Sequence, residues 1–328
     1  MFARLLNKGF RGSLVLIISL LGLLFLLQFF AGRAIEQEFY PNLFYNYFTQ
    51  FVQSKWAITL LNLSFVGLGL ILVSLLTVNQ EISDKQNYFP VFLYLIITAT
   101  CINPLQVNSQ ALTNVFILFA FFRLLQTYRR DDGLSEIYSA AFWLSVSSFI
   151  TISSIISFPL FFIVLTILRP FHWRDWVIAL IGFITPIFMY ECLAYLSNFN
   201  QWYLFDALRQ FFAGMHVPSF SEYYLPLALA LLILLLISIF QSLLQGFGNT
   251  VKRQRAKSIL LWLIFFSLFA VFSSGANSSS ILLIYAIPFS FFIGDFLFQL
   301  RQIKITNTLL AIIMLCSALV ILAEFSLL

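Results

Sequence analysis

Apolar runs of about 20 residues recur along the whole chain, with only short polar breaks between them. A helix of about 20 residues is what crosses the roughly 30 Å hydrocarbon layer of a membrane. Charged residues make up only 9% of the chain, against about 25% in an ordinary soluble domain. The runs lack the alternation of barrel strands, and backbone groups in lipid must be satisfied within a helix or a closed barrel. The sequence therefore predicts an all-α, polytopic helical membrane bundle.

About eleven transmembrane helices are expected, at 13–31, 56–78, 89–103, 111–127, 135–151, 154–168, 176–196, 225–245, 259–273, 281–299 and 308–326. We interpret the first as an uncleaved span, because its apolar part is long and no small-residue cleavage site follows it. The run 134–168 leaves two alternatives, a hairpin of two short helices or one long kinked helix. No internal repeat or linker divides the chain, so 1–328 is expected to be a single integral membrane domain.

The distribution of lysine and arginine predicts the orientation. With the amino terminus in the cytoplasm, fifteen of the eighteen basic residues fall on the cytoplasmic side, as the positive-inside bias requires. Merging 134–168 into one span would reverse every later loop and oppose this bias. We therefore expect a multi-pass protein of the bacterial inner membrane. In a membrane protein this distribution says more than the formal charge of +5, so we expect membrane lipids as partners and no nucleic acid.

Two loops on the predicted outer face, 33–55 and 197–224, are long enough to hold structure. Both mix aromatic residues with a few charges, which is typical of segments that lie in the lipid interface. On the cytoplasmic side, RPFHWRDW (169–176) concentrates charge, but each charged residue has a structural explanation there. Asp175 near a helix start is favoured by the helix dipole. The basic stretch KRQRAK (252–257) is interpreted as an orientation signal and a lipid contact.

The candidate catalytic and binding residues lie on the predicted outer face, where acidic side chains occur that the orientation of the chain does not explain. Glu36 and Glu38 follow the first span, and a carboxylate there could act as a general base or hold a divalent cation. Asp206, Arg209 and His216 form a second group, in which Arg209 is a natural clamp for phosphate. The alternatives remain solvated glutamates and a local Asp206–Arg209 pair, three residues apart on a helix. No other metal ligand or cofactor site is identified.

Within the spans, Arg123, Glu191 and Asp295 are the ionisable residues deepest in apolar sequence. Charge in a membrane is a functional hypothesis by default, but each lies within about two turns of an expected helix end, where its side chain can reach the interface. An uncharged polar strip consists of Asn103, Asn108, Gln110 and Asn114. It could line a cavity, or cap short helices and hydrogen-bond across the bundle.

The segment SFPLFFIVLTILRPFHWRDWVIALIGFITPIFM (157–189), with the preceding EIYSAAFWLSVSSF, resembles an uncharacterised family of multi-pass membrane proteins of Bacteroidetes. The resemblance rests on an apolar hairpin, an L-R-P-F-x-W-R-[ED]-W turn and a following G-F-x-T-P span. Some members of that family carry the label beta-carotene monooxygenase. The sequence does not support that label here, because the clustered histidines that such chemistry needs are missing.

A looser similarity is to GT-C type glycosyltransferases, which use polyprenyl-phosphate sugars. They have about a dozen spans, a cytoplasmic amino terminus and an acidic residue in the first outer loop, a role that would fall here on Glu36 or Glu38. The resemblance implies an envelope transferase that takes a polyprenyl-phosphate-linked donor at the outer face. Glu36-Gln37-Glu38 departs from the usual acidic pair of those enzymes. A non-enzymatic membrane scaffold or assembly subunit is the alternative, and a transporter is the third hypothesis.

Overall fold

The computed structural model consists of helices throughout the part of the chain that it describes. Ten α-helices and two 3₁₀ turns, and no strand, occur among those residues. This confirms the all-helical prediction. The structure describes residues 22, 54–79, 82–84, 87–102, 107–128, 132–196, 208–209, 221–244, 250–274, 277–300 and 302–326.

The helices follow the expected apolar runs in order. The elements are α4 (Lys55–Val78), α5 (Phe89–Cys101), α6 (Ser109–Gln126), α7 (Leu134–Ile150), η1 (Ile152–Ile156), α8 (Ser157–Leu168), α9 (Trp173–Leu196), η2 (Glu222–Tyr224), α11 (Leu225–Leu244), α12 (Val251–Ser274), α13 (Ser278–Gln299) and α14 (Ile303–Ser326). Seven of them are long and apolar enough to cross a membrane, namely α4, α6, α9, α11, α12, α13 and α14. The first expected span, 13–31, lies outside the described residues apart from Gly22.

The run 134–168 forms two helices, which settles the alternative that the sequence left open. Helix α7 ends where Thr151 adopts an extended conformation, and the 3₁₀ turn η1 leads from it into α8. The Oγ atoms of Ser147 and Ser154 lie 3.0 Å apart across this break, and Thr151 meets Thr113 of α6 at 2.9 Å. The Ser154 hydroxyl also donates to the carbonyl oxygen of Thr151 at 2.9 Å, so a side chain satisfies a backbone group where the helix is interrupted.

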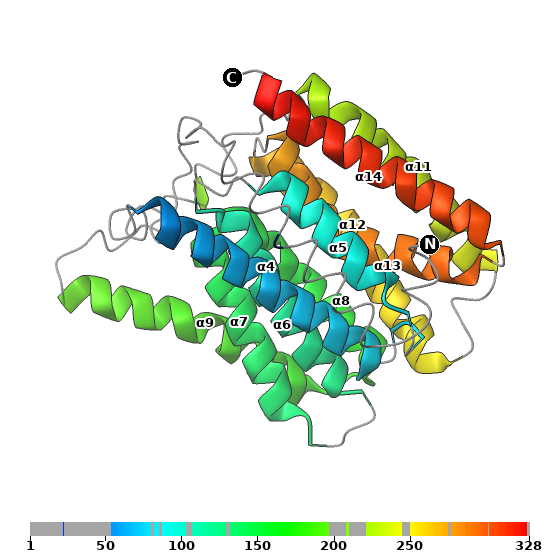
Figure 1. Cartoon of the computed structure of the whole chain (residues 1–328). Helices are drawn as coiled ribbons and strands as arrows, with labels where there is room; N and C mark the ends of the chain where they lie inside the picture. Colours follow the sequence, from blue (N-terminus) through cyan, green and yellow to red (C-terminus); the bar gives the residue numbers. More distant parts are fainter. Residues whose placement is uncertain are drawn as a thin grey trace.

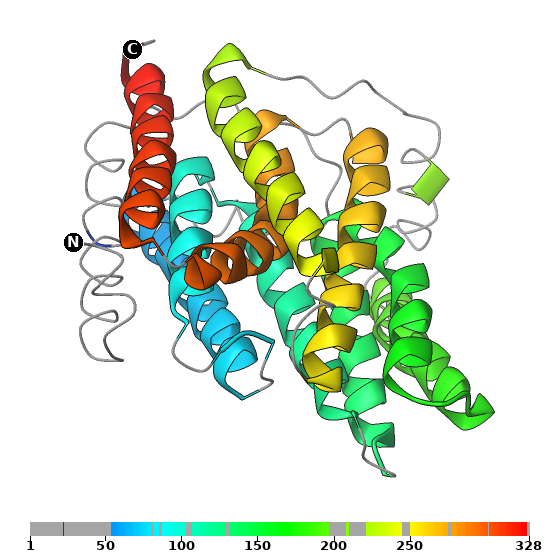
Figure 2. The same cartoon turned by 90° about the vertical axis from the view of Figure 1, so that its right-hand side faces the viewer.

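Successive helices alternate in direction, so the bundle has two distinct ends (Figure 2). We call the basic end the one that holds the last turns of α4, α6, α8, α11 and α13 and the first turns of α5, α7, α9, α12 and α14. Ten lysines and arginines are among the described residues, and eight belong to the basic end: Arg123, Arg169, Arg174, Lys252, Arg253, Arg255, Lys257 and Lys304. Lys55 begins α4 at the opposite end.

Helices α5 and α13 pack together in the middle of the bundle (Figure 1). Every residue of α5 is buried, although this helix has only 13 residues. A helix this short is compatible with a membrane because protein, rather than lipid, surrounds it. Close approach to α13 depends on Gly294, where a Cβ atom would lie 2.7 Å from the backbone nitrogen of Pro90.

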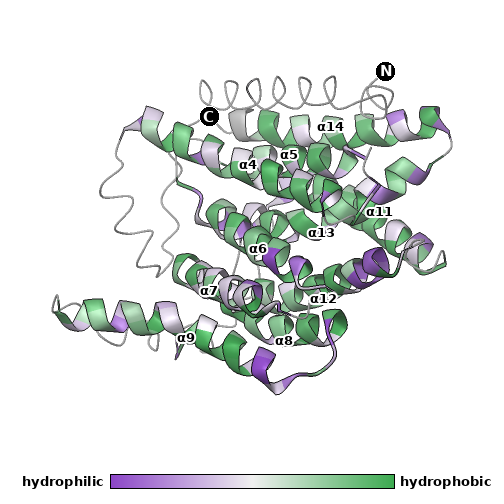
Figure 3. Ribbon diagram, turned by 90° about the horizontal axis from the view of Figure 1, so that it is seen from below, coloured by the Kyte–Doolittle hydropathy of each residue, from purple (hydrophilic) through white to green (hydrophobic). Residues whose placement is uncertain are grey.

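Helices α9, α11 and α14 form the periphery. In the apolar stretch of 18 residues that makes each of them long enough to span a membrane, only 28% of α9 and 33% of α11 and of α14 is buried. Figure 3 shows that the peripheral helices are largely apolar, and that α9 diverges from the body of the bundle. Large apolar side chains such as Phe188, Phe240 and Leu315 are exposed on them. Exposed apolar surface on helices of this length is what a lipid environment would cover.

Candidate functional site

Most of the residues that the sequence analysis predicted for the outer face lie outside the part of the chain that the structure describes. Glu36, Glu38, Asp206 and His216 lie outside the described residues. Arg209 is described, and its side chain is exposed. Among the described residues, no group of three or more His, Cys, Asp or Glu side chains could hold a metal ion. The hypotheses on Glu36 and Glu38 therefore stay predictions.

The RPFHWRDW stretch forms the turn between α8 and α9. Arg169 follows α8, and its guanidinium lies 3.4 Å from the carboxylate of Asp175 in the first turn of α9, with both side chains buried. The expected place of Asp175 at a helix start is confirmed, whereas Arg169, which we interpreted as a lipid contact, is held by this ion pair. Arg174 lies over the exposed ring of Trp173, 6.0 Å from its centroid.

KRQRAK differs from the expectation, because it is part of a helix and its side chains contact the protein. Helix α12 begins at Val251, two turns before the expected start at 259. Arg253 pairs with Asp84 at 2.6 Å. Arg255 donates to the carbonyl oxygen of Leu168, which ends α8, at 2.9 Å. Helix ends leave such carbonyls without intrahelical partners, so Arg255 satisfies one of them.

The fourth basic residue of this stretch, Lys257, forms a buried ion pair. Its ammonium nitrogen lies 2.8 Å from Oδ2 of Asp295 in the last turns of α13, and both side chains are at most 10% exposed. We expected the Asp295 side chain to reach the interface, and this was wrong. The carboxylate instead points into protein, because a cation from α12 and two polar groups from the α4–α5 connector surround it.

Those two polar groups are Ser83 and Asn87. The hydroxyl of Ser83 donates to Oδ1 of Asp295, and the Asn87 amide donates to the same oxygen at 3.2 Å. The Asn87 amide also lies 2.6 Å from Oγ of Ser83, and its Oδ1 accepts from the backbone N–H of Phe89, which starts α5. Lys257, Ser83 and Asn87 thus supply three donors to one carboxylate, as a buried charge requires.

A small cavity lies beside this ion pair. Polar side chains of α11 and α13 line it, namely Ser238, Gln241, Ser242 and Gln299, together with Lys257 and Asp295. The centre of a water molecule can move through about 10 Å³ of it, which is room for about one water. The ammonium of Lys257 has three donors. One of them bonds to Asp295, and this cavity is where another can bond.

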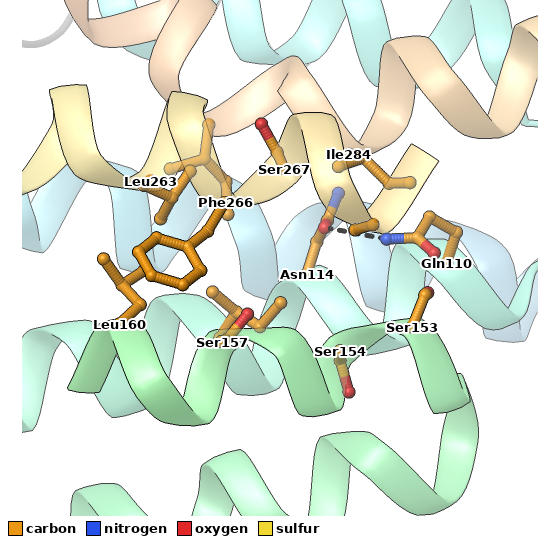
Figure 4. A pocket seen from close by; sticks show the side chains of 13 residues that line it. Gln110, Asn114, Ser153, Ser154, Ser157, Leu160, Leu263, Phe266, Ser267 and Ile284 are labelled. Atoms are coloured by element: carbon orange, nitrogen blue, oxygen red, sulfur yellow. Dashed lines mark hydrogen bonds between the residues drawn. The ribbon is translucent and has the colours of Figure 1, made fainter. Parts of the chain in front are cut away.

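A second polar cavity lies at the end of the bundle opposite the basic end, between α6, η1, α8, α12 and α13 (Figure 4). Its polar groups are Gln110, Asn114, Ser153, Ser154, Ser157 and Ser267. The Asn114 amide donates to the carbonyl oxygen of Leu283 at 2.8 Å, and the Gln110 amide lies 3.5 Å from Oδ1 of Asn114. About 40 Å³ is accessible to the centre of a water molecule, enough for about three waters.

The polar strip of the sequence analysis therefore has both of its expected roles. Asn108 caps α6 by accepting from the backbone N–H of Ala111 at 2.9 Å, whereas Gln110 and Asn114 line the cavity. Asn103 lies outside the described residues. The sequence did not indicate Ser83, Asn87 and Lys257 as a group. The spacing of Arg253 and Lys257 was a signal that could have been used, because residues four apart lie on one face of a helix.

No protein-family model, no curated protein and no solved structure matches this chain. The two polar zones, at opposite ends of α12 and α13, are therefore the observations from which a function can be argued.

Proposed function

We propose that this chain is a multi-pass protein of a bacterial inner membrane, with eleven spans and with its amino terminus and its basic end in the cytoplasm. Eight of the ten described lysines and arginines belong to that end, and cytoplasmic loops carry such an excess. Reporter fusions after Gly133 and after Asn277 test this, because these residues lie in connections at opposite ends of the bundle. The first fusion should be cytoplasmic and the second should not; the reverse result contradicts the orientation.

Its proposed activity is that of an envelope transferase, which binds a polyprenyl-phosphate-linked sugar at the outer face. The observation that carries this proposal is the cavity lined by Gln110, Asn114 and four serines. Amide and hydroxyl groups without charge suit the hydroxyl groups of a sugar, for which they supply both donors and acceptors. Room for about three waters admits one or two such hydroxyl groups at the edge of a sugar, and the rest of the ring would lie outside the cavity. The cavity lies at the end opposite the basic end, where the proposed orientation puts the outer leaflet.

The catalytic groups of this proposal belong to the two outer loops. Glu36 or Glu38 would take the proton from the acceptor hydroxyl or hold a divalent cation. The hydroxyl oxygen then bonds to the sugar, and polyprenyl phosphate leaves with the electron pair of the broken bond. Arg209 would contact the phosphate, with Asp206 and His216 beside it, because guanidinium matches phosphate geometry.

Binding can be tested on the purified full chain in detergent with a short-chain polyprenyl-phosphate hexose. A ligand at about 100 times its dissociation constant stabilises a protein by about 2.7 kcal/mol, which raises the melting temperature measurably. Asn114→Leu should remove this shift. Asn62→Leu is the matched control, because Asn62 is an equally buried amide, bonded at the start of α6 instead of in the cavity.

Three outcomes separate the parts of the proposal. A shift that survives Asn114→Leu refutes the cavity as the sugar site, and no shift with the wild type refutes the donor class. Free polyprenyl phosphate, tested in parallel, shows how much of the shift comes from the lipid alone. Glu36→Gln with Glu38→Gln should leave the shift intact and abolish sugar transfer; unchanged transfer would rule out both carboxylates.

A membrane scaffold is the second candidate, and α9 favours it. This helix packs mainly on α7 (Figure 1). Its exposed apolar side chains include Ile184, Phe188 and Leu193. A photo-crosslinking residue in place of Phe188 tests it in whole membranes. A discrete protein adduct supports the scaffold, whereas adducts with lipid alone oppose it.

A further inference from the structure

Four aromatic side chains follow one another along α12, and three of them are exposed. Trp262, Phe265 and Phe269 are 41%, 49% and 55% exposed. The ring of Phe265 makes edge-to-face contacts with the other rings, with centroids 5.9 Å from Trp262, 5.8 Å from Phe266 and 5.3 Å from Phe269. We call Trp262, Phe265, Phe266 and Phe269 the aromatic ladder. Because their rings touch in sequence, they form one continuous aromatic surface.

Contact with lipid does not by itself require such a surface. Helices α11 and α14 also lie at the periphery, and their exposed large side chains among the described residues are leucine and isoleucine, apart from Phe240. Aliphatic side chains are as apolar as lipid chains and are sufficient for that contact. Phe240 and the exposed Phe188 of α9 make no ring contact with another described residue. The ladder therefore distinguishes α12 from the other lipid-facing helices.

The aromatic ladder is continuous with the cavity opposite the basic end. Residues three or four apart share one face of a helix, so α12 carries two neighbouring stripes of side chains. One stripe lines the cavity and consists of Leu263, Phe266, Ser267 and Ala270. The other is the ladder, and Phe266, which is half-buried, belongs to both. Figure 4 shows the Phe266 ring beside Leu160 of α8, which also lines the cavity. One ligand can thus contact the polar cavity and the ladder at the same time.

The ladder extends from the cavity toward the middle of the bundle. Helix α12 starts at the basic end, so Trp262 lies five residues closer to that end than Ser267 in the cavity, which corresponds to about 7.5 Å. In the proposed orientation the cavity lies on the side of the outer leaflet. A lipid of that leaflet has its polar head at the surface and its chain directed to the hydrocarbon core. The direction from the cavity to Trp262 is the direction in which such a chain runs.

We propose that the aromatic ladder binds the isoprenoid chain of the polyprenyl-phosphate sugar while an edge of the sugar occupies the cavity. This inference rests on the proposed function and adds the place of the chain. The double bonds of an isoprenoid chain present flat faces that pack on aromatic rings, and the rings supply a large apolar area. Neither the ladder nor the cavity lining contains a charged residue, so the phosphate between sugar and chain needs a cation from elsewhere, the role proposed for Arg209.

Tryptophan fluorescence measures contact with the ladder directly. Trp262 is kept as the single tryptophan of a full-length chain, and the other five are replaced by phenylalanine. The chain is reconstituted in phosphatidylcholine vesicles with brominated acyl chains, because bromine quenches a tryptophan that it touches. A polyprenyl-phosphate hexose without bromine should displace acyl chains from the ladder, so the quenching should be lost progressively as the donor concentration rises.

Leu315→Trp, in a chain without any other tryptophan, is the matched control. Leu315 is exposed on α14. It lies twelve residues after Ile303, where α14 starts, as Trp262 lies eleven residues after Val251, where α12 starts. Both helices start at the basic end, so the two side chains are at a similar depth. The quenching of Leu315→Trp should not change with the donor.

A second test keeps all natural tryptophans. Phe265→Leu with Phe269→Leu removes two rings of the ladder and keeps α12 apolar. It should weaken binding of the polyprenyl-phosphate hexose about tenfold in the melting measurement, because two aromatic contacts together are worth about one factor of ten. Phe240→Leu, which removes an exposed ring from α11, should leave the affinity unchanged. A double variant that binds as tightly as the wild type would overturn the proposal, even if the single-tryptophan chains do not fold.

The outcomes also separate this inference from the proposed function. A melting shift without loss of quenching at Trp262 overturns the place of the chain and leaves the donor class intact. Equal loss of quenching at Trp262 and in Leu315→Trp does the same, because it shows general exchange of lipid. If the donor causes neither a melting shift nor a loss of quenching, both proposals fail. Loss of quenching at Trp262 that Leu315→Trp does not share supports the ladder as the site of the chain.

Discussion

The contact between α7 and α9 depends on Gly182, and replacing this residue by alanine tests how closely the two helices pack. A Cβ atom there would lie 2.7 Å from the carbonyl oxygen of Tyr138 and 3.0 Å from Cβ of Ala141. Ordinary contact begins at 3.4 Å, so α9 must retreat by several tenths of an ångström. Small residues at such crossings let helices in membranes approach closely.

The magnitude follows from comparison with a second glycine. Alanine in place of glycine inside a helix gains about 1 kcal/mol in propensity, and this gain is common to Gly182→Ala and to Gly67→Ala. Gly67, in α4, has nothing within 4 Å of the position of a Cβ atom. The difference between the two variants is therefore the cost of the clash, about 1–3 kcal/mol for an overpacked contact.

Thermal unfolding of both variants in detergent measures this difference. At about 2 °C per kcal/mol for a large domain, Gly182→Ala should melt about 2–6 °C below Gly67→Ala. The carbonyl of Tyr138 is backbone and cannot swing aside as a flexible side chain would. A Gly182→Ala chain that melts with or above Gly67→Ala would refute the close approach of α7 and α9.

Further predictions concern the two polar zones. Lys257→Met should lower stability by about 3–5 kcal/mol, because it leaves the Asp295 carboxylate buried and unpaired; Lys257→Met with Asp295→Leu should recover most of this loss. Chemical denaturation of the three chains measures both effects, and equal losses for the single and double variants would contradict them. Asn114→Ala should lower the free energy of unfolding by about 1–3 kcal/mol, because the carbonyl oxygen of Leu283 loses the hydrogen bond from this amide. A change below about 0.5 kcal/mol would show that water replaces the amide.

The helices could be predicted from the sequence because their signal is local. Each described helix falls on one of the expected apolar runs, since burial in lipid or in a membrane bundle requires apolar side chains all round. The early start of helix α12 was not predicted, because KRQRAK is not part of an apolar run. Its basic side chains are nevertheless compatible with a helix, because Asp84, the Leu168 carbonyl and Asp295 satisfy three of them.

The candidate sites could be predicted only in part. Gln110 and Asn114 stood out because amides four residues apart share a helix face. The ion-pair network was not foreseen, since Ser83 and Asp295 are 212 residues apart and no spacing rule connects them. Asp295 was recognised as unusual, but whether a side chain near a helix end reaches water or protein depends on its neighbours in three dimensions. The local sequence does not contain that information.

The two polar zones lie on the same pair of helices, and the distance between them bears on how they could work. Ser267, in the cavity opposite the basic end, and Lys257 are ten residues apart on α12, which corresponds to about 15 Å along the helix. Buried apolar side chains of both helices lie between them, namely Leu260 and Leu263 of α12 and Phe291 and Phe292 of α13. An apolar layer of this thickness opposes a continuous file of water from one end to the other. The arrangement therefore favours two separate polar zones over a conducting pore. It also predicts that the two zones act independently, so that Asp295→Asn should leave the melting shift with the polyprenyl-phosphate hexose intact.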